Sequence, residues 1–256
     1  MSSARNRTSR SQTAVSREPA VTTAIFKAGD DVVTITPAME DYLKTIYRLS
    51  EDGQRVTTQA IAERLEVAAP SVTGMIKRLA DLHLVDHQRY RSVQLTPAGQ
   101  KAALEVVRHH RLLELYLAEA LGYSWDEVHD EAERLEHTIS EEFEARIDAA
   151  LGYPTIDPHG DPIPSMSGSV PQVSNDRLSS LAVGDAGTIS RVTDDDPDKL
   201  RYLGSIGLYP EVRIVLLERL PFGGPLRLDV NGEEHFLGAE LADSIHILRD
   251  EPVNAS

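Results

Sequence analysis

The chain has 256 residues, of which 41% are hydrophobic and 26% charged, and it carries a formal net charge of -15 at pH 7. This balance is typical of a globular protein with one large or two to three small domains, and it excludes a mainly disordered polyelectrolyte. The absence of Cys excludes disulfide scaffolds and thiolate metal ligands, and it is compatible with a reducing, cytoplasmic location. No apolar run approaches the ~18 residues that a membrane helix needs, so no membrane partner is expected.

Charge is distributed unevenly along the chain. Residues 54–101 carry seven Lys/Arg against four Asp/Glu, whereas residues 126–148 carry ten acids against two bases. The first segment is therefore a candidate for DNA phosphates and the second for cations. Because the start of the chain is rich in Arg and Ser, we interpret residues 1–35 as a disordered basic arm, with a transit-peptide leader as the alternative.

Residues 36–100 contain three short predicted helices and a hairpin. Thr36 can cap a first helix that starts at Pro37, and the segment TTQAIAERLEV predicts a second. Residues 71–79 predict a third, because their apolar side chains follow the i, i+3, i+4, i+7 spacing. The runs 84–87 and 92–95 are short enough to pair as a hairpin. This order of elements predicts a winged helix-turn-helix.

The third of these helices is the candidate DNA-reading element. If its apolar stripe docks on the second helix, polar and basic side chains remain outward, where a helix fits the major groove: Ser71, Thr73, Lys77 and Arg78. At the hairpin tip, Arg89 and Arg91 are candidates for contacts with the DNA backbone or the minor groove. The helix pair alone also fits ordinary core packing, and the Arg-tipped hairpin behind it favours DNA binding.

The middle of the chain is predicted to be helical. Thr96 and Pro97 can open a long helix that ends at Gly122, and a further single helix is expected from about Ser124 to Leu151.

The last third is predicted to be a linker and a β domain. Residues 154–175 are rich in Pro and Gly, which indicates a linker. Residues 176–250 contain alternating apolar runs and a two-residue hairpin signal at Asn231-Gly232, which predict a small β-barrel.

The segment HDEAERLEH, residues 129–137, concentrates groups that can bind a cation. At 100° per residue, His129, Glu133 and Glu136 lie within about 60° of one another, with His137 on the flank, at the edge of the apolar face. A solvated acidic face is the alternative, although only Arg134 is present here for i, i+4 ion pairs.

A second pair of ligand-type residues lies on the preceding helix. His110 and Glu114 are separated by one helical turn, and an antiparallel turn would bring them beside His129. Isolated histidines such as His159 and His246 have no partners by spacing, and we assign them no ligand role. Oxygen and imidazole donors suit Mn(II) or Fe(II). Spacing alone leaves the metal site and the solvated face both open.

The sequence resembles the diphtheria toxin repressor family of metal-dependent transcription regulators, which has an iron-sensing and a manganese-sensing branch. The resemblance covers about residues 37–164 and is carried by MEDYLKTIY, IAERLEVAAPSVTGMIKRL, LTPAGQ, RHHRLLELYL, VHDEAERLEH and PHGDPIP. It implies a mainly α N-terminal part, formed by a winged helix-turn-helix (36–100) and a helical metal-binding and dimerisation domain (101–153). A small all-β, SH3-like (FeoA-like) domain would follow.

The resemblance also implies ligand sets. By position, the family's primary metal site falls on Asp41, Glu133, Glu136 and His137, and its ancillary site on His110, Glu114 and His129. The iron branch has Met where this chain has Asp41 and Cys where it has Glu133, so the primary site implies Mn(II), with Fe(II) as the alternative. Two positions depart from the family's pattern. Lys44 replaces a second carboxylate of the manganese branch, which puts that branch's paired-metal arrangement in doubt.

Asp196 falls near a ligand that the iron branch takes from its SH3-like domain, but Lys199 occupies the other such position.

In the recognition helix, Pro70 and Ser71 match the family, whereas Gly74 replaces its base-contacting Gln. The operator sequence therefore does not carry over.

The resemblance implies a homodimeric repressor of metal-uptake genes that binds a palindromic double-stranded DNA operator when metal is plentiful. We expect the carboxylates of Asp41, Glu133 and Glu136 to repel one another without metal and to leave the first helix loosely positioned. A divalent ion would then fix two recognition helices one DNA turn, ~34 Å, apart. Two alternatives remain, a metalloenzyme with a carboxylate and His site and a metal-independent winged-helix regulator.

Overall fold

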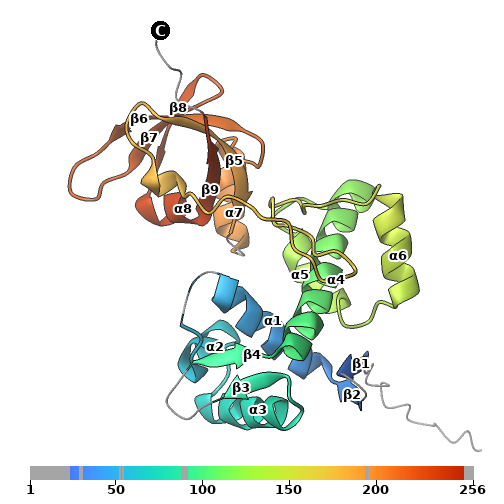
Figure 1. Ribbon diagram of the computed structural model, residues 1–256. Helices are drawn as coiled ribbons and strands as arrows, with labels where there is room; N and C mark the ends of the chain where they lie inside the picture. Colours follow the sequence, from blue (N-terminus) through green and yellow to red (C-terminus); the bar gives the residue numbers. More distant parts are fainter. Residues whose placement is uncertain are drawn as a thin grey trace, which may run out of the picture.

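The structure is a computed structural model that describes residues 24–28, 31–51, 53, 55–87, 92–193 and 196–250. Its N-terminal helices and its C-terminal sheet lie at opposite ends, and the long helix α4 (Pro97–Leu121) runs between them (Figure 1). Among the described residues, none of the helices is long and apolar enough to cross a membrane.

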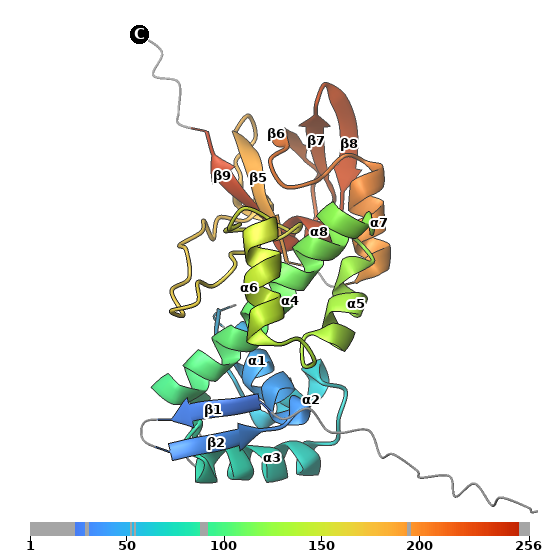
Figure 2. The ribbon, with the colours of Figure 1, turned by 90° about the vertical axis from the view of Figure 1, so that its right-hand side faces the viewer.

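Regular structure begins earlier than expected. Strands β1 (Ala24–Ala28) and β2 (Asp31–Ile35) pair antiparallel beside the start of α4 (Figure 2). The expectation of an arm that is disordered up to residue 35 is therefore wrong for this part. The sequences AIFKA and DVVTI are rich in apolar and β-branched residues, which favour strands, and Ile35 is buried in the first hydrophobic core. Residues 1–23 lie outside the described part.

The winged helix-turn-helix is present as predicted. Its elements are α1 (Pro37–Glu51), α2 (Thr58–Arg64), α3 (Ala69–Asp81), β3 (Val85–His87) and β4 (Val93–Leu95). The side chain of Thr57 caps α2, and a Pro in the first turn of α3 fixes its start. One core joins these elements, because the fully buried Ile46, Ile61 and Ile76 come from all three helices.

The start of α4 packs directly on the wing. A Cβ built on Gly99 would lie 1.8 Å from the carbonyl oxygen of Leu84, so only glycine permits this approach of α4 to the residue before β3.

The middle of the chain contains two helices after α4, where a single helix was predicted. They are α5 (Val128–Leu135) and α6 (Glu141–Ala150). Ser140 adopts extended backbone and its side chain caps α6, so the chain breaks between the two helices. Gly122 ends α4 with a φ of 73° and turns the chain so that α5 packs back on α4.

The segment expected to be a linker packs against the helices. Ile163 is 3% exposed in the core formed with α4, α5 and α6. Two arginines of α4 hold the backbone, since Arg108 donates to the carbonyl of Pro164 and Arg111 to that of Pro162. Asp157 and His159 are buried. These contacts turn the segment into part of the helical body.

The C-terminal region forms a five-stranded antiparallel sheet in the order β8-β7-β6-β5-β9. Its elements are η1 (Leu178–Ser180), β5 (Ala186–Val192), α7 (Pro197–Ser205), β6 (Arg213–Arg219), β7 (Leu226–Val230), β8 (Glu233–Leu237), α8 (Ala239–Ser244) and β9 (Ile245–Arg249). The predicted hairpin at Asn231-Gly232 is confirmed, with φ values of 55° and 89° between β7 and β8. The short helices α7 and α8 were not predicted.

The sole tryptophan of the sequence, Trp125, joins the helical body to this C-terminal domain. Its ring centre lies 4.9 Å from that of Tyr209 in the C-terminal domain and 5.6 Å from that of His159. Nε2 of His159 donates to the carbonyl of Trp125 over 2.7 Å. The turn between α4 and α5 therefore contacts both other parts of the chain.

Candidate metal centre

The ligand-type side chains come from α1, α4 and α5, which pack against one another. The reversal of the chain at Gly122 places α5 along α4, and α1 contacts α4 as well. Three residues predicted as the primary site lie together as a result, with one ligand atom each within 4.8 Å of the others: Asp41, Glu136 and His137. Nε2 of His137 lies 2.8 Å from Oδ1 of Asp41 and 3.4 Å from Oε1 of Glu136.

Glu40 orients the imidazole of His137. It is buried, and its Oε2 lies 2.5 Å from Nδ1 of His137. A carboxylate on one ring nitrogen fixes the ring and directs the other nitrogen, here Nε2, toward Asp41 and Glu136. Sequence reasoning missed Glu40. Its position directly before Asp41, in the first turn of α1, was the available signal.

Glu133, the fourth residue predicted for the primary site, groups instead with His110 and Glu136. Its Oε1 lies 2.7 Å from Nζ of Lys44, and the same ammonium lies 2.5 Å from Oε1 of Glu136. These contacts correct the expectation that the carboxylates face one another and repel. Each has a cationic or imidazole neighbour, and helix α1 is tied to the α5 region through them.

The residues predicted as the ancillary site lie together: His110, Glu114 and His129. Nε2 of His110 lies 2.9 Å from Oε1 of Glu114 and 3.1 Å from Nδ1 of His129. His110 is fully buried and Glu114 is 3% exposed. The predicted antiparallel packing of the two helices is therefore confirmed at these side chains.

The imidazoles of His137 and His110 are held as cations by their carboxylate neighbours. Burial lowers the pKa of His137, but hydrogen bonds with Asp41 and Glu40 outweigh it and raise the pKa to about 10. Burial likewise opposes the charge of His110, yet Glu114 and Glu136 raise its pKa to about 8. A metal ion that takes these nitrogens must replace protons.

The pKa values of two glutamates, Glu136 and Glu133, shift in the opposite direction. Burial raises the pKa of Glu136, and its contacts with His110 and Lys44 more than reverse this, so its pKa lies below the usual range. The pKa of Glu133 is lowered in the same way, chiefly by the charge of Lys44 against the effect of burial. Both glutamates are therefore anionic at neutral pH.

A further group of ligand-type residues was not predicted: Glu114, Asp157 and His159, all buried and within the same 4.8 Å limit. Burial and the neighbouring Asp161 and Glu114 raise the pKa of Asp157 to about 8. His159 had been assigned no ligand role because spacing along the chain gave it no partner. Its partners come from α4 and from the packed segment 154–175, and only the fold brings them together.

Asp196, predicted as a ligand from the C-terminal domain, has a structural role here. It is the N-cap of α7, and its side chain accepts from the backbone N–H groups of Asp198 and Lys199. Within the described part of the chain, Asp196 belongs to none of the groups of three ligand-type side chains.

The predicted DNA-binding residues of α3 lie on its outer face. Val72, Ile76 and Leu79 are buried. Exposed are Pro70, Ser71, Thr73, Lys77 and Arg78. Arg89 and Arg91 lie outside the described residues.

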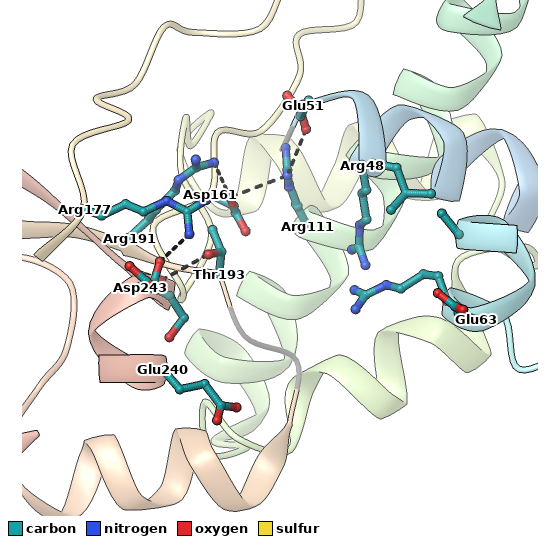
Figure 3. A pocket seen from close by; sticks show the side chains of 14 residues that line it. Arg48, Glu51, Glu63, Arg111, Asp161, Arg177, Arg191, Thr193, Glu240 and Asp243 are labelled. Carbon is teal, nitrogen blue, oxygen red and sulfur yellow. Dashed lines mark hydrogen bonds and ion pairs between the residues drawn. The ribbon is translucent and has the colours of Figure 1, made fainter. Parts of the chain in front are cut away.

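A cavity of about 560 Å³ lies between α1, α2 and the C-terminal domain. It is lined by five arginines and five acids, and Figure 3 shows Asp161 between Arg111 and Arg191. Asp161 pairs with Arg191 at 3.1 Å and lies 3.6 Å from Arg111. None of its lining residues belongs to the ligand groups above, so this charged junction is separate from the metal centre.

Three family models match the chain in succession. Residues 34–93 match the iron dependent repressor N-terminal DNA binding domain, and residues 96–165 match the iron dependent repressor metal binding and dimerisation domain. Residues 177–249 match the FeoA domain. The iron-dependent repressor IdeR of Mycobacterium leprae is 34% identical over 230 residues, which cover 85% of this chain and 98% of that protein. The chain belongs to the diphtheria toxin repressor family.

Other relatives in this family agree. The diphtheria toxin repressor of Corynebacterium diphtheriae is 33% identical over 81% of this chain and 95% of its own length. A solved manganese-dependent transcriptional repressor in complex with manganese superposes with a TM-score of 0.78 at 44% identity, covering 82% of this chain and 99% of that one. The structure of the manganese regulator SloR gives a TM-score of 0.72 at 35% identity, over 84% of this chain and all of that one. Members named for iron and members named for manganese thus share this fold.

The residues of this family member fit a divalent transition metal. The groups offer only carboxylate oxygens and imidazole nitrogens, because the chain has no Cys. Glu114 and Glu136 are buried, and the positive charge that His110 and Lys44 give them here is of the kind that a bound ion would supply.

Proposed function

We propose that this chain represses metal-uptake genes by binding a palindromic operator as a homodimer when Mn(II), or alternatively Fe(II), is bound. The observation that carries this proposal is the position of Asp41. It lies on α1, the first helix of the DNA-binding domain, and its carboxylate meets His137 and Glu136 at the end of α5. A cation held there joins the two parts of the molecule.

We assign the primary site to Asp41, Glu133, Glu136 and His137, and the ancillary site to His110, Glu114 and His129. Two groups containing Glu136, with Asp41 and His137 or with Glu133 and His110, support the primary assignment. Oxygen and nitrogen donors without thiolate favour Mn(II) or Fe(II) over sulfur-seeking ions, although affinity order would favour zinc if it were free. The paired-metal arrangement is not part of this proposal.

Each residue has a distinct task in this mechanism. His137 and Asp41 would hold the ion, which would supply two positive charges between α1 and the α5 region. Glu40 keeps the ring of His137 in place through Nδ1. Because metal and operator favour the same arrangement of α1, each raises the affinity of the other by an equal factor.

The exposed face of α3 is proposed to read the operator. Lys77 and Arg78 supply charge for phosphates and bases, and Ser71 and Thr73 at the N-terminal end supply hydroxyl groups. We retain Arg89 and Arg91 of the wing as proposed backbone contacts, and Asp196 as an assignment that its capping role does not favour. The protein would act in the cytoplasm, where it meets DNA.

The alternative of a metalloenzyme receives less support. The named relatives are repressors, and the charged cavity between α1, α2 and the C-terminal domain lies away from the ligand groups. A regulator is therefore the better interpretation of the same carboxylates and imidazoles.

The proposal is tested by gel shift of promoter fragments with chelator, Mn(II), Fe(II) and Zn(II). We expect tight operator binding only with metal. Lys77→Gln should weaken DNA binding about equally on all sequences, and it should reduce the slope of log affinity against log salt concentration by about the amount of one phosphate contact. Operator binding that is equally tight with chelator and with Mn(II) would exclude the mechanism and favour the metal-independent regulator.

A further inference from the structure

Lys44 places a fixed positive charge inside the proposed metal centre. Lys44 is only 4% exposed, and its Nζ lies 2.7 Å from Oε1 of Glu133 and 2.5 Å from Oε1 of Glu136. Lys44 lies three residues after Asp41 and four after Glu40 on α1, so all three side chains project from one face of the helix. The lysine thus joins α1 to the α5 region, as a metal ion in this site would.

The oxygen that Lys44 contacts on Glu136 is the one that an ion held together with His137 would use. Oε2 of Glu136 is engaged by Nδ1 of His110 at 2.5 Å. Oε1 is left for another cation, and it also lies 3.4 Å from Nε2 of His137. An ion bound by His137 and by Oε1 of Glu136 would therefore stand close to the ammonium. In a buried site, where screening is weak, two such cations repel strongly.

We propose that Lys44 competes with the metal ion for the two glutamates, so that metal binding is an exchange of an ammonium for a divalent cation. This inference rests on the proposed function. It has two consequences. Lys44 raises the metal concentration at which the repressor responds, and it keeps α1 attached to the α5 region when metal is removed. Lys44 is a positioning residue in this scheme and does not bind the metal.

The first test measures Mn(II) binding by full-length wild type, Lys44→Gln and Lys44→Arg with electron paramagnetic resonance of free Mn(II). Lys44→Gln keeps a donor and removes the charge, so its dissociation constant should fall by at least about tenfold. Lys44→Arg keeps the charge and should stay within about threefold of wild type. Lys101→Gln is the matched control, because it removes an exposed lysine of α4 nine residues, or about 13 Å, before His110.

The second test measures the distance between spin labels on α1 and α5 in the presence of chelator. Because the chain has no Cys, nitroxide labels will attach only to the two introduced cysteines. We place these at exposed positions, Ala38→Cys on α1 and Asp130→Cys on α5. With Lys44 or Arg at position 44 we expect one narrow distance distribution. With Gln we expect a broader one, because the link between Glu136 and α1 is weakened. Identical distributions in all three backgrounds would overturn the positioning role.

The outcomes separate the two proposals. If wild type binds Mn(II) and gains operator affinity with it, while Lys44→Gln binds Mn(II) no more tightly, the Lys44 inference fails alone. If neither protein binds Mn(II) at millimolar concentration, the proposed function fails and the inference falls with it. Tighter binding by Lys44→Gln only, with the controls unchanged, supports both.

Discussion

Nδ1 of His110 lies 2.5 Å from Oε2 of Glu136, and this contact connects the primary and ancillary groups through a single carboxylate. Glu136 is 1% exposed and faces His137 and Lys44 with its other oxygen. The two proposed sites, which the family resemblance treats separately, are therefore neighbours joined by the contact between Glu136 and His110.

Replacing Glu136 by Gln should disable both groups together. The amide cannot supply the second anionic oxygen, so we expect Mn(II) affinity to fall by about 100-fold or more, measured by calorimetry, with a matching loss of Mn(II)-dependent operator binding. Glu142→Gln is the control, because Glu142 is exposed on α6, where it forms an ion pair with Arg146 one turn further along the helix. Equal Mn(II) affinity in the two variants would contradict the assignment.

Glu40→Gln should weaken metal binding without removing a ligand. Gln can still accept a hydrogen bond from Nδ1 of His137, but it no longer raises the basicity of the ring. We expect a loss of about 10-fold in Mn(II) affinity with the stoichiometry unchanged, and Glu40→Ala should lose more, up to about 100-fold. A change of stoichiometry in calorimetric titrations would show that Glu40 binds the metal itself.

His246 makes the C-terminal domain sensitive to acid. Burial, together with the charges of Arg191 and Arg177, lowers its pKa to about 4 despite the opposing influence of Asp161. The unfolded chain, with a usual His pKa near 6.5, binds the proton first. The contribution of His246 is thus complete above about pH 6.5 and is lost as the pH falls toward 4.

Urea unfolding at several pH values tests this. Wild type should lose up to about 3 kcal/mol of unfolding free energy between pH 6.5 and 4 through this residue, and His246→Gln should lack that part of the slope. His235→Gln, on β8 of the same domain, is the control and should keep it. If the unfolding free energies of wild type and His246→Gln changed with pH in parallel, the prediction would be refuted.

Gly99 and Gly74 should respond oppositely to alanine. At Gly99 the new Cβ would meet the carbonyl oxygen of Leu84 at 1.8 Å, so backbone must move and we expect a loss of about 3 kcal/mol or more in thermal or urea unfolding. Gly74 is inside α3 with no atom near its Cβ position, and alanine there should stabilise by about 0.5–1 kcal/mol. Equal effects would contradict the close packing of α4 on the wing.

The elements that sequence reasoning recovered are those with local signals. Thr96, Gly122 and Asn231-Gly232 mark a helix start, a helix end and a hairpin, and each acts within a few residues of itself. The break between α5 and α6 was missed because no Gly or Pro marks it between residues 124 and 151. The capping role of Ser140 became visible only through the hydrogen bond to the N–H of Phe143.

The ligand groups show the same limit. His110 and Glu114 were predictable because one helical turn separates them, and His129 because a short turn reverses the chain. The pairing of His159 with Glu114 depends on how segment 154–175 packs on α4, which no local pattern encodes. The family resemblance placed Lys44 in the primary site but not its contacts, and these show a cation bridging two acids.

The position of Trp125 gives this repressor an internal optical reporter. Its indole contacts the ring of Tyr209 in the C-terminal domain and that of His159 in the buried acidic group, both in a tilted arrangement, while its own backbone belongs to the turn between α4 and α5. Since the sequence contains no second tryptophan, light at the red edge of the tryptophan absorption band excites Trp125 alone, and the emission reports on the contact between the two parts of the molecule. Any separation of the FeoA-like domain from the helical body must therefore change the fluorescence of the unlabelled, wild-type protein.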